Sequence, residues 1–405
     1  MDTGELAWAV TAAALVLFMT PGLAFFYGGL VKAKSVISMM MMSFGSLGLI
    51  SVLWVLYGAN MSAIGDEPIF LAGNPFSNFA FLNGYDNETL IGATFGATFA
   101  IITTALISGA IADRAKFSSW MIFAGIWATV VYFPVAAWVW GGGWIISIGD
   151  TILEGFPAVI DYAGGTAVHI NAGAAALALA LVLGKRIGFA KGAHTPHNPP
   201  FVLLGAAILW FGWFGFNVGA EYANDMANVG LIAVNTLGAT AAAVIGWLIV
   251  EKIKDGKPTS VGAGSGAVAG LVAITPSCAN LDPFWALVLG LLAGAVCALA
   301  VELKFKLGFD DSLDVVGIHL VGGLIGTLYL GFFAVETGLV FGGGFGQLAV
   351  QAIAALGVMV YSFVLAFIIG FAIEKTIGFR VKNEDEVAGI DTIIHGEEGY
   401  VLDAK

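Results

Sequence analysis

The sequence predicts an all-α protein that crosses a membrane many times. Of its 405 residues, 59% are hydrophobic and only 11% are charged, whereas soluble domains carry roughly 25% charged residues. A spanning helix needs about 20 mostly apolar residues, and short polar breaks separate eleven such stretches. They run over residues 7–30, 36–57, 90–111, 119–140, 162–184, 200–220, 229–250, 260–277, 284–303, 315–334 and 347–374. With the lipid bilayer as its solvent, the chain's formal charge of −12 gives no indication of nucleic-acid binding.

The positive charges predict the orientation of the chain. An odd number of spans puts its two ends on opposite sides of the membrane, and cytoplasmic loops carry an excess of Lys and Arg. With the N-terminus outside, all 16 Lys and Arg residues fall in cytoplasmic breaks or in the tail: Lys32, Lys34, Arg114, Lys116, Lys185, Arg186, Lys191, Lys252, Lys254, Lys257, Lys304, Lys306, Lys375, Arg380, Lys382 and Lys405. The outer loops carry only acids: Asp66, Glu67, Asp86, Glu88, Asp150, Glu154, Glu221, Asp225, Asp282 and Glu336.

We therefore expect a multi-pass protein of the cytoplasmic membrane with an outer N-terminus and a cytoplasmic C-terminus. Its transmembrane domain is predicted over residues 1–376 and a polar tail over 377–405. The first cation is Lys32, so the positive segment that opens a cleavable signal peptide is missing. Cys278 and Cys297 are the only cysteines, and they indicate neither a disulfide framework nor a metal site.

An Asp and a His recur at one spacing in two predicted spans. His169 follows Asp161 by eight residues at the start of the fifth span, and His319 follows Asp311 by eight residues at the start of the tenth. In the predicted topology these two spans enter the membrane from opposite faces. A chance match is conceivable in a chain with five His, but spacing, depth and polarity together favour two inverted five-helix halves plus a final helix. Such repeats place their site near the midplane of the membrane.

His169 and His319 are the only histidines within the predicted spans. Either could be a packing residue bonded to a backbone carbonyl, but intramembrane ionisable groups usually face a bundle interior and mark function. Two neutral imidazoles in an apolar lumen suit a small, polar, uncharged substrate, because each offers a donor or an acceptor. A bare monovalent cation faces a cost of order 20 kcal/mol in so dry a path. Ammonium can shed a proton to avoid that cost, whereas potassium and sodium cannot.

Several aromatic residues are placed near the predicted outer face. Phe95 and Phe99 share one helical face, Trp140 ends the fourth span, and Trp213 and Phe216 lie near the outer end of the sixth. Aromatic faces bind partly dehydrated cations at about 0.5–2 kcal/mol each. Any one of these residues alone could be a packing or interface residue. Together with the twin histidines, they predict an aromatic entrance for a cation.

Five motifs resemble signatures of the superfamily of ammonium transporters, methylamine permeases and Rhesus proteins. They are MTPG at 19–22, FYGGL at 26–30, DYAGG at 161–165 leading into HINAG at 169–173, WFGFN at 213–217 and DVVGIH at 314–319. The resemblance covers essentially the whole chain and is closer to the prokaryotic ammonium transporters than to Rhesus proteins. It implies a homotrimer with one pore in each subunit, and transport of ammonium or ammonia, with methylammonium as a further substrate.

The resemblance also implies roles for the residues singled out above. Trp140 and Phe99, with Phe95 nearby, would form an outer recruitment site, and Phe99 would stack on Phe216 to gate the pore. The acid beneath that site would be Asp161. The pore histidines would be His169 and His319. The second half offers two further acids, Asp311 and Asp314, for a structural role or a proton path.

One position departs from the family pattern. Members usually carry a Ser four residues after the gating Phe, and its hydroxyl helps to bind the incoming cation, whereas this chain has Ala220. The loop between Trp140 and Asp161 also looks longer than in the family, which would change the vestibule. We therefore expect recruitment to depend mainly on the aromatic residues.

The tail from 377 to 405 is polar and acidic, and composition alone would predict disorder. Its sequence, which includes GFR at 378–380 and EVAGID at 386–391, resembles that of the family's regulatory tail. That resemblance implies a tail ordered against the cytoplasmic face that couples the subunits. It also implies a nitrogen-regulatory protein of the PII type as a partner.

Two smaller features are interpreted without a functional role. The pair Asp113-Arg114 after the third span is expected to be a solvated ion pair. A metal site at His194 and His197 is an alternative to a plain loop, but two His without further ligands fall short of the usual number.

Three functions remain open at the level of sequence. The first is transport of ammonium, as ammonia alone or as ammonia with a separately moved proton. The second is an ammonium sensor that conducts little, which the missing hydroxyl at Ala220 leaves possible. The third is a channel for a neutral gas, against which Trp140 argues, because a cation–π site has little use for a neutral molecule. Catalytic triads, phosphate loops and metal clusters are not evident, so neither an enzyme nor a cofactor is expected.

Overall fold

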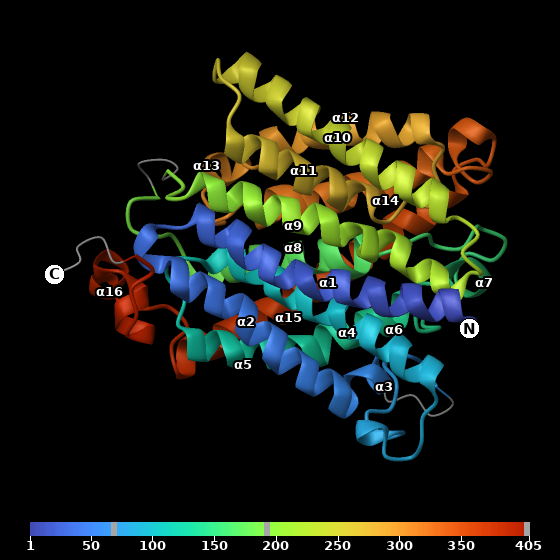
Figure 1. Cartoon of the computed structure of the whole chain (residues 1–405), viewed down its shortest axis with the longest axis horizontal. Helices are drawn as coiled ribbons and strands as arrows, with labels where there is room; N and C mark the ends of the chain where they lie inside the picture. Colours follow the sequence, from blue (N-terminus) through green and yellow to red (C-terminus); the bar gives the residue numbers. More distant parts are fainter. Residues whose placement is uncertain (66–70, 190–194, 401–405) are drawn as a thin grey trace.

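The protein is a bundle of long helices that run roughly side by side (Figure 1). The computed structural model describes residues 1–65, 71–189 and 195–400. Within these ranges the only β-type pairing is an isolated bridge between Ala115 and Arg380. The predicted all-α fold class is therefore confirmed. Asp66, Glu67, Lys191, His194 and Lys405 lie outside the described residues.

Ten helical segments of the described chain are long and apolar enough to cross a membrane, and an eleventh is shorter. Two long segments are single helices in the first and last positions, α1 (Thr3–Leu30) and α15 (Gly346–Thr376), and a third is α10 (Val229–Lys254). Four contain one α-helix each: Asn87–Ile111 contains α4 (Asn87–Ile107), Gly165–Leu183 contains α8 (Asn171–Leu183), Pro199–Ala223 contains α9 (Pro199–Val218) and Val316–Phe333 contains α14 (Val321–Phe333). Three contain two: Ala33–Met61 contains α2 (Val36–Leu53) and α3 (Ala59–Met61), Phe117–Val139 contains α5 (Phe117–Trp127) and α6 (Phe133–Val139), and Pro283–Leu307 contains α12 (Pro283–Ala300) and α13 (Leu303–Leu307). The short segment is α11 (Ser260–Ile274), and two brief helices, α7 (Ile148–Thr151) and α16 (Asn383–Ala388), lie at the two ends of the bundle. These segments match the eleven predicted spans.

The eighth span ends earlier than the sequence predicts, at Ile274 rather than at residue 277. The carbonyls of Thr275 and Pro276 accept hydrogen bonds from the backbone N–H groups of Ala163 and Tyr162. Pro276 also has no N–H to continue the helical ladder. The end of α11 therefore docks on the turn that precedes the fifth span, and this contact helps to place that turn.

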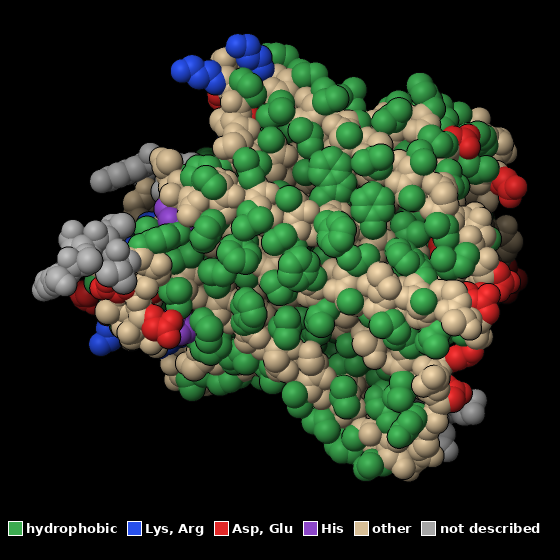
Figure 2. All heavy atoms as spheres, in the orientation of Figure 1, with side chains coloured by type: hydrophobic (Ala, Val, Ile, Leu, Met, Phe, Trp, Pro, Cys, Tyr) green, Lys and Arg blue, Asp and Glu red, His purple; other side chains and the backbone are tan. Residues whose placement is uncertain are grey.

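Charge divides the bundle into an acidic end and a basic end. The acidic end holds α7 and those predicted outer acids that the structure describes, such as Glu88 beside the N-terminus. The basic end holds α16 and the turn between α10 and α11. In Figure 2 the Lys and Arg side chains in view lie at the basic end together with some Asp and Glu, a broad hydrophobic surface covers the middle, and the charged side chains in view at the acidic end are Asp and Glu. This is the surface expected of a membrane protein. Which end faces the cytoplasm stays a prediction.

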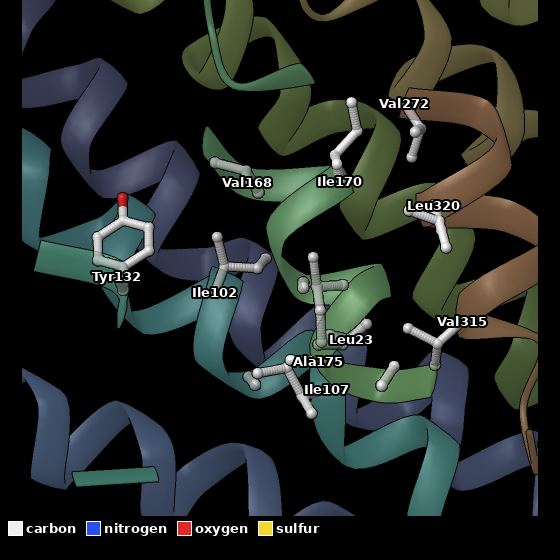
Figure 3. Packing of buried hydrophobic residues seen from close by; sticks show 14 of the residues in the cluster. Leu23, Ile102, Ile107, Tyr132, Val168, Ile170, Ala175, Val272, Val315 and Leu320 are labelled. Carbon is white, nitrogen blue, oxygen red and sulfur yellow. The ribbon is translucent and has the colours of Figure 1, made fainter. Parts of the chain in front are cut away.

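Apolar side chains pack in the middle of the bundle. Figure 3 shows Leu23 of α1, Ile102 of α4, Val168 before α8 and Leu320 before α14, all of which are buried. Association of helices in a membrane depends on close packing of this kind rather than on escape from water. Leu23, Ile102 and Val168 also line a small cavity together with His169 and His319.

The two predicted halves share an unusual local structure. His169 lies in a π-helical turn, Gly165–Ile170, and His319 lies in another, Val316–Leu320. The residue three positions after each predicted Asp has a left-handed backbone, with φ of +115° at Gly164 and +65° at Asp314. Glycine adopts this conformation freely, and Asp is among the few other residues that tolerate it. The matching turns support the inverted repeat.

A buried charge cluster closes the basic end. The guanidinium of Arg114 is fully buried and donates to the backbone carbonyl of Asp310 at 2.6 Å. The guanidinium of Arg186 lies 2.9 Å from the Asp310 carboxylate and 3.0 Å from that of Asp113. The predicted solvated pair of Asp113 with Arg114 is therefore wrong, because both side chains are buried and Asp113 pairs with Arg186. Burial tends to lower the pKa of Arg186, but Asp310 and Asp113 outweigh burial and raise it.

The tail is ordered against the basic end. The carboxylate of Asp391 accepts hydrogen bonds from the backbone N–H groups of Ile37 and Ser38 at 3.0 and 2.7 Å, at the start of α2. The Tyr400 hydroxyl contacts Nε2 of His197 at 2.9 Å. Within residues 377–400 the tail therefore packs against this end, while its regulatory role and its coupling of subunits stay predictions. The other ring nitrogen of His197 lies 2.8 Å from a backbone carbonyl, and the described residues contain no cluster of metal-binding side chains.

Candidate functional site

A hydrophobic cavity at the acidic end, which we call the vestibule, has a volume of about 440 Å³. Its wall includes Trp54, Phe95, Phe99, Trp140, Tyr162, Phe216 and Ala220. The indole of Trp140 is 39% exposed, and its Nε1 donates a hydrogen bond of 2.8 Å to the backbone carbonyl of Asp161. That bond fixes the ring while much of it stays accessible. An accessible indole face is suited to a partly dehydrated cation.

Two stacked phenyl rings form the floor of the vestibule. The centroids of Phe99 and Phe216 lie 4.1 Å apart, with an angle of 15° between the planes. Phe95 packs on Phe99 from the next helical turn at 4.9 Å, and Trp140 meets Phe99 edge-on at 6.0 Å. Phe216 borders both the vestibule and a second, deeper cavity. The pair therefore separates the two spaces, as a gate would.

The deeper cavity, which we call the lumen, is narrow and contains both histidines. Its volume is about 10 Å³, close to the minimum that holds one water molecule. Nδ1 of His169 lies 3.2 Å from Nδ1 of His319, and both side chains are buried. Two neutral rings in this geometry need one Nδ1 as donor and the other as acceptor. The remaining wall is apolar, with Leu23, Ile102 and Val168 among its residues.

The structure places Trp213 deeper than the sequence indicates. This residue lines the lumen rather than the vestibule, and its ring stacks on His169 with centroids 5.5 Å apart. Its Nε1 donates to the hydroxyl of Thr275 at 2.8 Å. Trp213 precedes Phe216 by nearly one helical turn on α9, which carries it below the gate. This contact orients the ring of His169.

The side chain of Asp161 does not line the vestibule. Its two carboxylate oxygens accept four backbone hydrogen bonds, of 3.0, 2.6, 2.9 and 2.9 Å, from Gly164, Gly165, Thr166 and Ala167. These are N–H groups at the start of the fifth span, which would otherwise lack partners. Asp161 therefore holds the turn that carries both His169 and the carbonyl contact of Trp140.

The acids of the second half lie at the opposite mouth. Asp311 accepts backbone hydrogen bonds from Val315 and Val316 at 3.1 and 2.7 Å, as Asp161 does in its half. Asp314 pairs with Lys304 at 2.5 Å and borders a cavity of about 420 Å³ at the basic end. Asp311 thus holds the turn at the start of its span, and Asp314 borders the cavity at the basic end. A part of either acid in a proton path stays a prediction.

The sequence matches proteins of known family. A model of the Ammonium Transporter Family matches residues 7–400. An ammonium transporter of Mycobacterium tuberculosis strain H37Rv is 52% identical over an alignment of 436 positions. The alignment covers 98% of this chain and 90% of the relative. The chain belongs to the Ammonium Transporter Family. The ammonium transporter Amt1 of Archaeoglobus fulgidus is 41% identical over 407 residues, covering 99% of this chain and all of the relative.

Solved structures share the fold of this chain. The crystal structure of Candida albicans Mep2 superposes with a TM-score of 0.85 at 30% identity, covering 95% of this chain and 88% of that one. A structure titled Sensor Amt Protein has a TM-score of 0.85 at 28% identity, covering 96% of this chain and 98% of that one. The chain is a multi-span membrane protein of a transport family rather than of an enzyme family.

Two residues of this site were missed by the reasoning from sequence. Tyr162 lines the vestibule of this Ammonium Transporter Family member. The motif DYAGG was noted in the sequence, but within it a role was assigned only to Asp161. Glu221 was counted only among the acids of the outer loops, whereas its side chain is fully buried directly after Ala220. The sequence did offer one signal for Glu221, which is its position: it directly follows Ala220, where the family usually has a hydroxyl.

Proposed function

We propose that this chain transports ammonium by capturing the cation in the vestibule and passing ammonia through the lumen. The supporting observation is the order of the parts: an accessible indole, a closed stacked gate and a narrow lumen with two adjoining histidines. The aromatic vestibule suits a cation, whereas the lumen has room for about one small molecule and contains no charged side chain among its wall residues. A cation that gives up its proton at the gate, either back to the outer solution or to the histidine pair for separate transfer, satisfies both environments.

Purified protein in liposomes provides the direct test. Ammonium uptake and electrical current are measured together under an ammonium gradient. Uptake with current indicates ammonia plus a separately moved proton, and uptake without current indicates ammonia alone. Binding without either flux would support the second candidate, an ammonium sensor, which the likeness to a structure titled Sensor Amt Protein keeps in view.

The proposal extends to assembly and regulation. It includes a homotrimer with one pore in each subunit, an outer acidic end and a cytoplasmic basic end. The ordered tail and the cavity of about 420 Å³ lie at the same end, which suits a PII-type regulator that acts on the inner mouth. Native mass spectrometry of the purified protein measures the subunit number directly.

Removing the indole of Trp140 should weaken capture more than it slows maximal flux. In Trp140→Leu, the ammonium concentration for half-maximal uptake is expected to rise about two- to thirtyfold, which corresponds to a lost cation–π contact of about 0.5–2 kcal/mol. Maximal flux should change less, because the contact acts before the cation loses its proton. An unchanged half-saturating concentration in the liposome assay would rule out the recruitment role.

Restoring the usual hydroxyl at Ala220 should tighten ammonium binding modestly. The expected gain in Ala220→Ser is about 0.5–1.5 kcal/mol, the net worth of one hydrogen bond. Ala220 borders the vestibule, so a hydroxyl there can face the cation. Titration calorimetry with ammonium chloride, using sodium chloride as the control salt, measures the change. Equal or weaker affinity would show that this vestibule does not use the position.

A further inference from the structure

Glu221 is a fully buried carboxylate. It lies in a 3₁₀ turn, Gly219–Ala223, that extends α9 at the acidic end, and its side chain has no solvent-exposed surface. Among the described residues no Lys or Arg forms an ion pair with it. A buried carboxylate that is hydrogen-bonded but has no Lys or Arg beside it among these residues favours the approach of a cation.

The carboxylate of Glu221 is joined to the vestibule wall by a tyrosine. The hydroxyl of Tyr162 donates a hydrogen bond of 2.5 Å to Oε1 of Glu221. Tyr162 itself borders the vestibule, as does Ala220, the residue directly before Glu221. The backbone N–H of Tyr162 is bonded to the carbonyl of Pro276, so the ring is anchored at its base and at its tip.

The direction of this hydrogen bond determines what the hydroxyl can offer a ligand. A phenol has one proton and two acceptor lone pairs. With the proton committed to Glu221, the oxygen of Tyr162 is left as an acceptor, and a hydrogen-bonded carboxylate polarises it further. Such an oxygen suits a ligand that carries N–H donors and positive charge.

We propose that Tyr162, polarised by Glu221, is the oxygen ligand for the cation in the vestibule and takes the place of the hydroxyl missing at Ala220. This inference rests on the proposed recruitment of ammonium at Trp140. It assigns the cation two partners of different chemistry, an indole face and a phenol oxygen backed by a fixed negative charge. It also explains how Ala220 is compatible with capture.

Glu221 has a structural role as well, which decides the choice of variant. Its Oε2 accepts a hydrogen bond of 2.7 Å from the backbone N–H of Asn228, the residue before α10. Removing the carboxylate would loosen this turn whether or not it acts on a cation. Tyr162→Phe leaves that bond in place and removes only the hydroxyl.

The test compares Tyr162→Phe with a matched loss of a hydroxyl elsewhere. Tyr329→Phe is the control, because the Tyr329 hydroxyl also makes one hydrogen bond, to the carbonyl of Trp285, and the residue does not border the vestibule. Ammonium binding is measured by titration calorimetry on the full-length protein, uptake in liposomes, and thermal stability by unfolding of the purified protein.

Tyr162→Phe is expected to weaken ammonium binding about three- to tenfold, the range for loss of one hydrogen bond, with maximal uptake changed less than about twofold. Adding Ala220→Ser should recover a large part of the affinity in Tyr162→Phe, because a second oxygen then faces the same cation. Tyr329→Phe should leave affinity unchanged.

Unchanged affinity in Tyr162→Phe, or a loss shared equally with Tyr329→Phe, would overturn the inference. Failure of the proposed function has a different signature. If the wild-type protein binds ammonium in calorimetry but takes up none in liposomes, transport is wrong, and the Tyr162 comparison in the binding assay still decides the ligand assignment.

Discussion

Replacing both His169 and His319 with leucine is expected to abolish ammonium-driven current. The two Nδ1 atoms lie 3.2 Å apart and form a hydrogen-bonding pair in a lumen whose other described wall residues are apolar or aromatic. An all-apolar lumen offers a separated proton no route, and ammonia no partner. Because the cost of moving an intact cation through so dry a path is of order 20 kcal/mol, the loss of current should be essentially complete.

The measurement is current in liposomes under an ammonium gradient, with Met19→Leu as the matched control. Met19 also lines the lumen but is apolar, so its substitution changes shape without removing a hydrogen-bonding group. Thermal unfolding checks that the double variant is folded. Wild-type ammonium current in a folded double variant would make the histidines packing residues, and the proposed mechanism, though not the family membership, would fall.

Sequence reasoning succeeded where a single physical rule acts along the chain. The apolar runs located the spans because the thickness of the bilayer sets a length that each helix must reach. The spacing of Phe95 and Phe99 placed them together, as their ring contact of 4.9 Å confirms. The eight-residue spacing from Asp to His located two turns that share a left-handed residue and a π-helical histidine.

Reasoning from sequence failed where a contact joins distant segments. Asp113 and Arg114 are neighbours in sequence, yet each finds its partner elsewhere, Asp113 at Arg186 and Arg114 at Asp310. The early end of α11 depends on the docking of residues 162 and 163 upon it. The approach of Phe99 to Phe216 was expected only from the family resemblance, because local spacing carries no information about a contact between α4 and α9.

The role of Asp161 shows the same limit in the site itself. An acid beside a predicted cation site suggests a direct ligand, and its position in the motif cannot distinguish that from a structural role. In the structure the carboxylate is saturated by four backbone N–H groups. We infer that Asp161 acts through the turn that it organises.

Asp161→Ala is therefore expected to cause one of the largest losses of stability in the protein. Four buried N–H groups would lose their acceptor, and an unsatisfied buried group costs about 1–3 kcal/mol. Even with partial relaxation, the total should exceed roughly 3 kcal/mol. The turn also holds His169 and, through the Asp161 carbonyl, the indole of Trp140, so capture and conduction should be lost together with stability.

The matched comparison is Asp311→Ala, which removes an acceptor from two backbone N–H groups in the equivalent turn. Its loss of stability should be smaller, because fewer N–H groups are left unsatisfied. Thermal unfolding of both variants in detergent gives the difference, and calorimetry with ammonium chloride gives the affinity. A direct ligand role would produce another pattern: Asp161→Ala would unfold at nearly the wild-type temperature and yet lose ammonium binding. That pattern would mean that the carboxylate meets the cation itself, and that its four backbone bonds contribute little to holding the turn.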